Sequence, residues 1–286
     1  MLYLSSSAIK KDKIVDVLKL CELNGIRNIE LSGGTQYYST LLADLKEWKE
    51  KHSLCYACHA YFPPPPKDFV VNLAACNDGI YDRSLQHYLD CLELLKAIEC
   101  HVLGIHAGFL VEVGVDQIGG EIRADIVYDR QKAMERFCGA YNKIKKEAAK
   151  YQIEVYLENN VLDAGNYERF HCHNYFLMTD YDSIMEMKKE IDFPLLLDLG
   201  HLFVSSHTLG LDFEKQVAGL KEHVRWLHVS DNNGSLDQHK PLIPGSPIYD
   251  ALLKLADQSV NVTLEAKGSF AQIKENYEWL QRLLPD

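Results

Sequence analysis

The chain has 286 residues, of which 47% are hydrophobic and 25% are charged, as in an ordinary globular protein. Its formal net charge of −11 argues against a nucleic-acid partner, because proteins that bind phosphate backbones usually carry a basic face. No apolar run approaches the ~18 residues that span a bilayer, so no membrane partner is expected. At the N-terminus the apolar residues precede the lysines, the reverse of a secretory signal, and the sequence therefore predicts a cytoplasmic protein.

Eight cysteines are spread along the chain. In a cytoplasmic protein of this size they are expected to be free thiols that pack as small hydrophobic residues. Cys55 and Cys58 have the spacing of a redox pair, but they fall inside a predicted strand that no helix start follows. The cysteines therefore indicate neither a redox centre nor a zinc ribbon.

Segments with the pattern of strands alternate with segments that have the period of helices. The predicted strands cover residues 2–5, 26–31, 53–58, 101–105, 153–157, 195–197, 224–229 and 260–264. The predicted helices cover residues 9–23, 41–51, 81–98, 127–151, 181–190, 212–222, 248–256 and 270–284. Asn24 and Gly25 are expected to end the first helix, and Asp82 or Ser84 to cap the third.

Eight strand–helix units in a chain of this length predict a (β/α)₈ TIM barrel, an α/β fold that forms a single domain over residues 1–286. A doubly wound open sheet is the alternative, but no Gly-x-Gly-x-x-Gly follows the first strand. Four consecutive prolines at 63–66 lie in a strand-to-helix loop. They are interpreted as a stiff local segment rather than a domain boundary.

Residue types that bind metals stand at the ends of six consecutive predicted strands. In chain order they are His59, His106, Glu158, Asp198, His228 and Glu265. His201 follows Asp198, and Gly200 between them is expected to turn the chain so that both point to one place. A later loop adds Asp237 and His239. Because barrel strands end on one rim, these side chains are expected to converge on a divalent metal, and imidazole with carboxylate suits zinc, manganese, iron or cobalt.

With these motifs the chain resembles the xylose-isomerase-like TIM-barrel superfamily, which includes endonuclease-IV-like AP endonucleases (family 2) and many sugar phosphate isomerases and epimerases. The matching pieces are His59-Ala-Tyr, His106-Ala-Gly, Glu158-Asn-Asn, Asp198-Leu-Gly-His201, His228-Val-Ser-Asp231, Asp237-Gln-His239 and Leu264-Glu265. The resemblance implies that Glu158, Asp198, His228 and Glu265 hold a central divalent metal. In the endonuclease branch, more than one zinc ion is held, the further ones by residues that match His59, His106, His201, Asp237 and His239. The prolines at 63–66 and the segment 244–247 depart from the nuclease pattern.

The activity favoured by the resemblance is a divalent-metal-dependent isomerase or epimerase of a small sugar or sugar phosphate. The metal would bind a carbonyl and a neighbouring hydroxyl and stabilise an enediolate, while Glu158 and Glu265 take and return a proton from two sides. Polar loop residues are candidate contacts to substrate hydroxyls, namely Asn160, Lys267, His171 and His173.

Other activities remain open at this point. A multi-zinc phosphodiester hydrolase is favoured by the nine filled ligand positions, and it is opposed by the acidic balance and by the lack of basic rim loops. A lyase or dehydratase, a non-catalytic binding barrel and a homo-oligomer are all compatible with the sequence.

Overall fold

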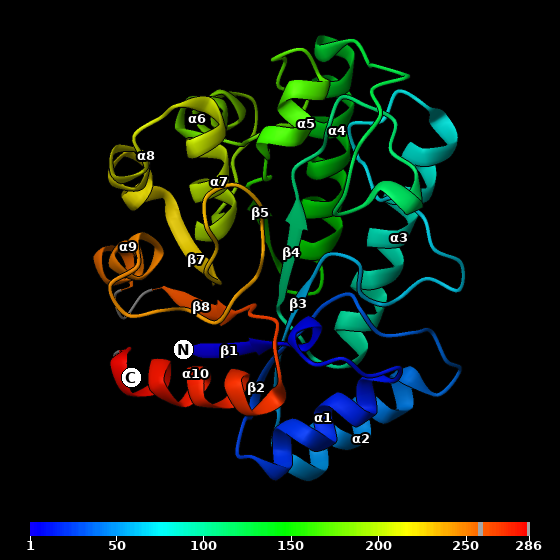
Figure 1. Cartoon of the computed structure of the whole chain (residues 1–286). Helices are drawn as coiled ribbons and strands as arrows, with labels where there is room; N and C mark the ends of the chain where they lie inside the picture. Colours follow the sequence, from blue (N-terminus) through cyan, green and yellow to red (C-terminus); the bar gives the residue numbers. More distant parts are fainter. Residues whose placement is uncertain (257–259, 285–286) are drawn as a thin grey trace.

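In the computed structural model, which describes residues 1–256 and 260–284, parallel strands form a closed barrel. Each strand pairs with the next in sequence, and β8 pairs with β1 (Figure 1). The strands are β1 (Leu2–Ser5), β2 (Asn28–Leu31), β3 (Cys55–His59), β4 (Val102–His106), β5 (Glu154–Glu158), β6 (Leu195–Asp198), β7 (Val224–Val229) and β8 (Asn261–Leu264). The predicted (β/α)₈ barrel is confirmed.

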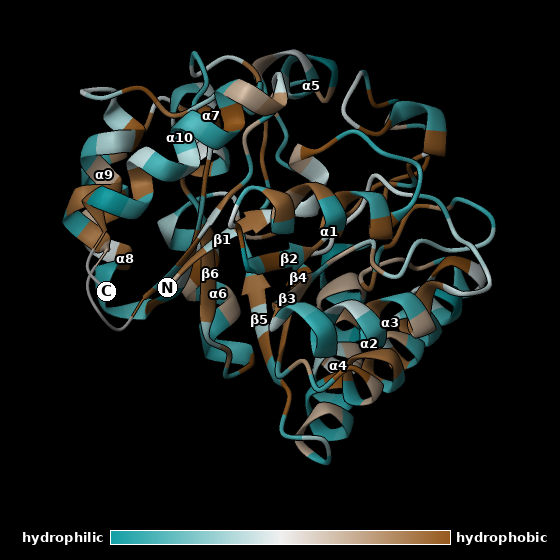
Figure 2. Ribbon diagram, turned by 90° about the horizontal axis from the view of Figure 1, so that it is seen from below, coloured by the Kyte–Doolittle hydropathy of each residue, from teal (hydrophilic) through white to brown (hydrophobic). Residues whose placement is uncertain are grey.

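Helices surround the barrel and bury their apolar faces against it (Figure 2). They are α1 (Ile14–Leu23), α2 (Leu41–His52), α3 (Asp78–Ala97), α4 (Arg130–Ala149), α5 (Ala164–Arg169), α6 (Tyr181–Glu190), α7 (Leu199–Leu209), α8 (Phe213–Leu220), α9 (Pro247–Leu255) and α10 (Phe270–Leu283). Among the described residues, no helix is long and apolar enough to cross a membrane. All eight cysteines are free thiols, as predicted.

The helix ends show which local signals were identified correctly. Gly25 follows α1 with φ +74°, so the predicted stop after Asn24 is confirmed. The predicted cap of α3 is wrong, because the helix begins earlier, at Asp78, and its N-cap is Asn77, whose side chain accepts a hydrogen bond from Gly79 N. The Ser84 hydroxyl instead donates to the Ile80 carbonyl inside the helix.

Two helices were not predicted, α5 and α7. Helix α7 begins directly after Asp198, whose Oδ1 accepts a 2.7 Å hydrogen bond from His201 N and so caps the helix. Gly200 therefore lies in the helix and does not form the expected turn. Glycine fits this position because it has no side chain: a Cβ there would lie 3.1 Å from Asp198 Oδ1 and 3.2 Å from Asn232 Nδ2.

Alternation along the strands divides the inside of the barrel into two layers. A lower layer packs apolar and aromatic side chains, namely Tyr3, Ala57, Tyr156, Leu196 and Trp226. Because side chains in a strand repeat with a period of two, the residue two positions further on each of these strands also points inward. Those residues form the upper layer, namely Ser5, His59, Glu158, Asp198 and His228. The barrel thus carries its polar residues directly above an apolar floor.

Gly104 in β4 leaves room for one member of this upper layer. A Cβ at this position would lie 2.6 Å from His59 Cδ2 and 3.0 Å from Leu196 Cδ1. We expect Gly104→Ala to lower the free energy of unfolding by about 1–3 kcal/mol, because the core has no space for the methyl group. The matched control is Gly139→Ala in α4, where a Cβ meets nothing within 4 Å. This control should raise stability by up to about 1 kcal/mol. Urea unfolding of both variants checks the prediction, and an unchanged midpoint for Gly104→Ala would contradict it.

Candidate metal centre

The carboxylate of Glu158 lies at the middle of the upper layer and has no solvent exposure. Its Oε2 is 2.7 Å from His59 Nε2 and 2.8 Å from His106 Nδ1. Its Oε1 is 3.1 Å from His228 Nδ1. Burial disfavours the charged carboxylate, but His106 and His59 outweigh burial and hold the pKa of Glu158 well below its usual value.

Three buried atoms in and beside this carboxylate make no well-formed hydrogen bond among the described residues, although Glu158 Oε1 and His228 Nδ1 lie 3.1 Å apart. They are Glu158 Oε1, Asp198 Oδ2 and His228 Nδ1. Their residues come from three successive strands, and each residue offers one ligand atom within 4.8 Å of those of the other two. Burial raises the pKa of Asp198 to about 6. Unpaired buried polar atoms are unfavourable, and two oxygens and one nitrogen at this spacing fit a divalent metal ion. The cluster can therefore hold such an ion.

Glu265, directly after β8, adjoins this group through His228 and belongs to another set of ligand atoms within 4.8 Å, with Glu30, His59 and His228. Its Oε2 lies 3.5 Å from His228 Nδ1, and its Oε1 accepts hydrogen bonds from Ser5 Oγ at 3.0 Å and Ser7 Oγ at 3.3 Å. Burial opposes the charge of Glu265, but His228 more than compensates and lowers its pKa. The four residues expected to hold a central metal, Glu158, Asp198, His228 and Glu265, thus lie together.

The remaining predicted ligands lie on two sides of this group. His59 and His106 share Glu158 with it, and these three residues form a further set of ligand atoms within 4.8 Å. On the other side, Asp237 Oδ2 lies 2.8 Å from His239 Nε2 and 3.4 Å from His201 Nε2. His239 has φ +47°, so the loop is not extended at this residue, and the two side chains meet. The structure therefore brings all nine predicted residues to one rim.

Glu30 at the end of β2 belongs to the cluster and was not predicted. Its two oxygens lie 3.0 and 3.1 Å from His228 Nε2. The indole of Trp226 can only donate, so it donates to Thr263 Oγ1 at 2.9 Å, and the Thr263 hydroxyl donates to Glu30 Oε2 at 3.0 Å. When Glu30 accepts from His228 Nε2 as well as from Thr263, Nδ1 is the ring nitrogen left for a metal.

The neighbouring carboxylates also shift the pKa of His228. Burial disfavours the imidazolium, but Glu30 and Glu265 outweigh it and raise the pKa of His228 well above its usual value. An ion at Nδ1 must displace that proton, so metal binding releases protons to solvent. Glu30 thus orients the imidazole and determines which nitrogen is free.

We expect Glu30→Gln to weaken the binding of zinc about 10–100-fold, the usual effect of losing a carboxylate behind a ligand histidine. Glu154→Gln is the matched control, because Glu154 also lies on a barrel strand but contacts the Tyr156 hydroxyl, away from the cluster. Competition titration against a chromophoric chelator gives both dissociation constants. Equal zinc affinity in Glu30→Gln and wild type would show that Glu30 does not support the ligand.

A pocket of about 560 Å³ opens above the cluster. Its floor includes His59, His106, His201, His239 and Glu265, and one wall carries Pro64, Pro65, Phe69, Val115 and Ile118 from the loops after β3 and β4. Glu265 reaches the pocket, whereas Glu158 lies below its surface. The sequence suggested that the two carboxylates face the pocket from two sides, and the structure does not place them so.

The suggested substrate contacts separate into two kinds. Lys267 lines the pocket. The Asn160 amide instead donates to the carbonyls of Ala107, Gly108 and Leu177 at 2.9–3.0 Å, so it ties loops together below the rim. The two loop histidines, His171 and His173, do not line the pocket either.

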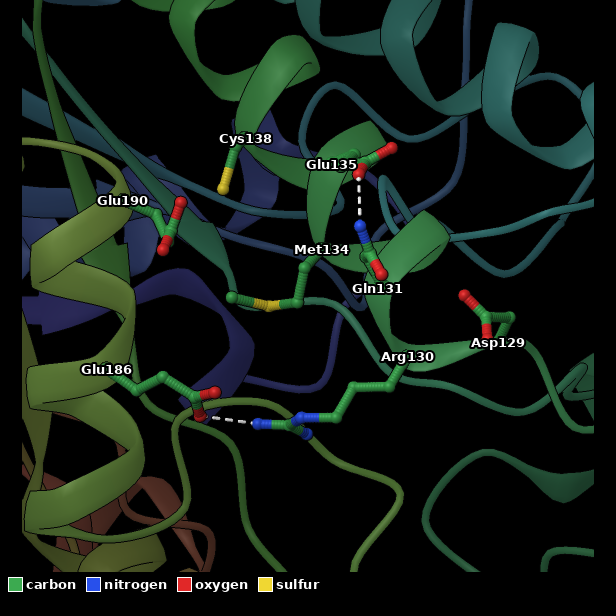
Figure 3. Close-up of a pocket in the computed structure, with 8 residues that line it drawn as sticks. All are labelled: Asp129, Arg130, Gln131, Met134, Glu135, Cys138, Glu186 and Glu190. Carbon is green, nitrogen blue, oxygen red and sulfur yellow. Dashed lines mark hydrogen bonds and ion pairs between the residues drawn. The ribbon is translucent and has the colours of Figure 1, made fainter.

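A larger cavity of about 740 Å³ lies on the flank of the barrel, between α4 and α6 (Figure 3). Arg130 pairs there with Glu186 at 2.5 Å, and Gln131 donates to Glu135 at 3.1 Å. Its lining contains none of the nine predicted ligands. Size alone therefore does not identify the functional site, whereas the convergence of buried ligand atoms does.

The chain belongs to the xylose isomerase-like TIM barrel family, whose model matches residues 18–283. An uncharacterized protein of Methanocaldococcus jannaschii is 22% identical over 193 residues, a match that spans 68% of this chain and 62% of that protein.

Solved structures share the fold. A D-tagatose 3-epimerase-like protein is 18% identical with a TM-score of 0.72, covering 98% of this chain and 96% of that one. D-psicose 3-epimerase from Clostridium cellulolyticum, solved with D-tagatose, is 12% identical with a TM-score of 0.67, covering 99% and 97%. An AP endonuclease of family 2 from Brucella melitensis is 13% identical with a TM-score of 0.66, covering 99% of each chain.

Proposed function

We propose that this protein is a divalent-metal-dependent isomerase or epimerase of a small carbohydrate. The observation that carries the proposal is the carboxylate of Glu265, which lies on the pocket floor and next to the unpaired ligand atoms of the cluster. A divalent ion bound there would act as a Lewis acid and stabilise negative charge on neighbouring substrate oxygens. The likeness of the fold to sugar epimerases supports a carbohydrate as the substrate class.

The residues of the pocket have separate roles in this proposal. Glu158, Asp198 and His228 would hold the ion, with Glu30 behind His228. Glu265 takes a proton from the carbon next to the carbonyl, since it is 8% exposed and faces the substrate space. Ser5 and Ser7 donate to its Oε1 and keep that carboxylate oriented.

A single glutamate in the pocket favours isomerisation between an aldose and a ketose. In that reaction one group can remove a proton from one carbon and return it to the neighbouring carbon on the same face. Epimerisation needs a second group on the opposite face, and Glu158, the expected partner, lies below the pocket. Zinc, manganese, cobalt and iron all suit the mixed imidazole and carboxylate ligands.

We expect the metal-loaded protein to exchange hydrogen for deuterium at the carbon next to the carbonyl of at least one sugar from a panel of aldoses, ketoses and their phosphates in D₂O. Glu265→Gln should slow that exchange about 10²–10⁴-fold, the range for losing a general base. Asp68→Asn, which removes the other pocket carboxylate, is the control. Proton NMR follows the exchange, and the metal content of each variant separates loss of the base from loss of the ion. Near-native exchange by metal-loaded Glu265→Gln would rule out this role.

A multi-metal phosphoester hydrolase is the second candidate. Glu158 favours it, because its two oxygens face two different sets of ligand atoms, as a carboxylate does when it bridges two ions. Asp237 with His201 and His239 offers a third position. Clustered ions stabilise the attacking and leaving oxygens of a phosphoester. The net charge of −11 and the apolar pocket wall favour a small substrate over duplex nucleic acid.

Metal stoichiometry distinguishes the two candidates. If the centre is multinuclear, the wild type should bind more than one zinc ion per chain, and His59→Ala and His239→Ala should each lose one, because each variant lacks a ligand of an outer position. His173→Ala, which changes a histidine outside the pocket, is the control. Elemental analysis after dialysis counts the ions. One ion per chain in the wild type and in all three variants would contradict the multinuclear centre, and the isomerase proposal would stand.

A further inference from the structure

A further part of the pocket lining is polar and contains no predicted metal ligand. It consists of Ser7, the segment 32–35 and Lys267. These pieces follow β1, β2 and β8, which are neighbours in the closed barrel. Ser32 N donates to Ser6 Oγ at 2.8 Å and Ser7 Oγ donates to Glu265 at 3.3 Å, so contacts connect the three pieces.

The hydroxyl of Thr35 in this wall lacks a protein partner. Thr35 is only 9% exposed, and its Oγ1 makes no hydrogen bond within the described part of the chain. A buried hydroxyl without a partner is unfavourable, and such groups usually bind water, an ion or a ligand. Because Thr35 lines the pocket, a ligand in the pocket can supply the missing partner.

The backbone around Thr35 also offers donors. The N–H groups of Gly33, Gly34 and Thr35 donate to no acceptor in residues 1–256 and 260–284. Gly34 has φ +99°, a conformation that glycine adopts readily, and a Cβ there would lie 3.9 Å from Ser7 Cα. Successive free N–H groups in such a loop form a concavity that suits an anion.

Lys267 supplies a positive charge to this part of the pocket. It is the one lysine or arginine among the described pocket-lining residues. Its main chain is fixed, because Lys267 N donates to the His239 carbonyl at 2.6 Å. A lysine ammonium beside hydroxyl and backbone donors is a common arrangement for binding a phosphate group.

We propose that Gly33, Gly34, Thr35 and Lys267 form a subsite for the phosphate group of a phosphorylated sugar. This inference rests on the proposed function, because it names the substrate class of the same pocket. The phosphate lies against the wall above β8, β1 and β2, and the reacting carbons lie over Glu265 and the ligand atoms. The apolar wall of Pro64, Phe69, Val115 and Ile118 offers no partner for a second charged group.

The test uses a ligand that cannot react, so that binding is measured apart from catalysis. Isothermal titration calorimetry compares D-arabinitol 5-phosphate with D-arabinitol on the zinc-loaded protein, since neither polyol has a carbonyl. The wild type should bind the phosphate about tenfold or more tightly, the effect of one charge-assisted hydrogen bond. Thr35→Val and Lys267→Met should lose most of this preference and bind D-arabinitol as before. Thr35→Ser keeps the hydroxyl and should keep the preference. Lys46→Met on α2, an exposed lysine outside the pocket, is the charge control.

Equal affinity of the wild type for the two polyols would overturn the subsite. A preference that survives both Thr35→Val and Lys267→Met and disappears after chelation would assign the phosphate to the metal ions, which also overturns it. Loss of the preference in both variants supports it even if no sugar exchanges deuterium. In that case the isomerase proposal fails and the subsite remains. If a sugar exchanges deuterium but the wild type shows no preference for the phosphate, the subsite fails and the isomerase proposal stands.

Discussion

The buried charge of Glu158 is the constraint on which the rest of the centre depends. A carboxylate without solvent access is tolerated only if other groups compensate its charge, and here His59, His106 and His228 surround it. His228 in turn contacts Glu30 and Glu265. This arrangement still leaves Glu158 Oε1, Asp198 Oδ2 and His228 Nδ1 without a well-formed hydrogen bond, and a divalent ion is one group that can satisfy all three.

The fold positions this centre by the simple alternation of strand residues. Trp226 and His228, like Tyr156 and Glu158, are two residues apart, so an apolar layer supports a polar layer without any special loop. For this reason the barrel and much of its rim could be predicted from the sequence. Short apolar strands that end in histidine or a carboxylate identified the barrel and six residues of the rim, because parallel strands in a barrel must end side by side.

The features that were missed have physical reasons. Glu30 lies in the run Asn28-Ile29-Glu30-Leu31, and a glutamate that points into a barrel gives the same alternating pattern as one on a solvated face. Helix α7 was missed because Asp198 caps a helix with one oxygen and faces the cluster with the other, and the sequence indicated only the second role. Asn160 carries no local signal that separates a substrate contact from a bond to backbone carbonyls. The two pocket walls are built by loops without motifs, so their polarity became visible only in three dimensions.

The central claim is that the buried layer of the barrel is a metal site in which Glu30 fixes His228. Anomalous diffraction at the zinc absorption edge, from crystals of the protein purified without chelators and supplied with zinc, tests it most directly. The account predicts a peak about 2.0–2.2 Å from Glu158 Oε1, Asp198 Oδ2 and His228 Nδ1. A map with no peak between these three atoms would contradict it. A zinc ion bound to His228 Nε2, where Glu30 now makes its contact, would also contradict it.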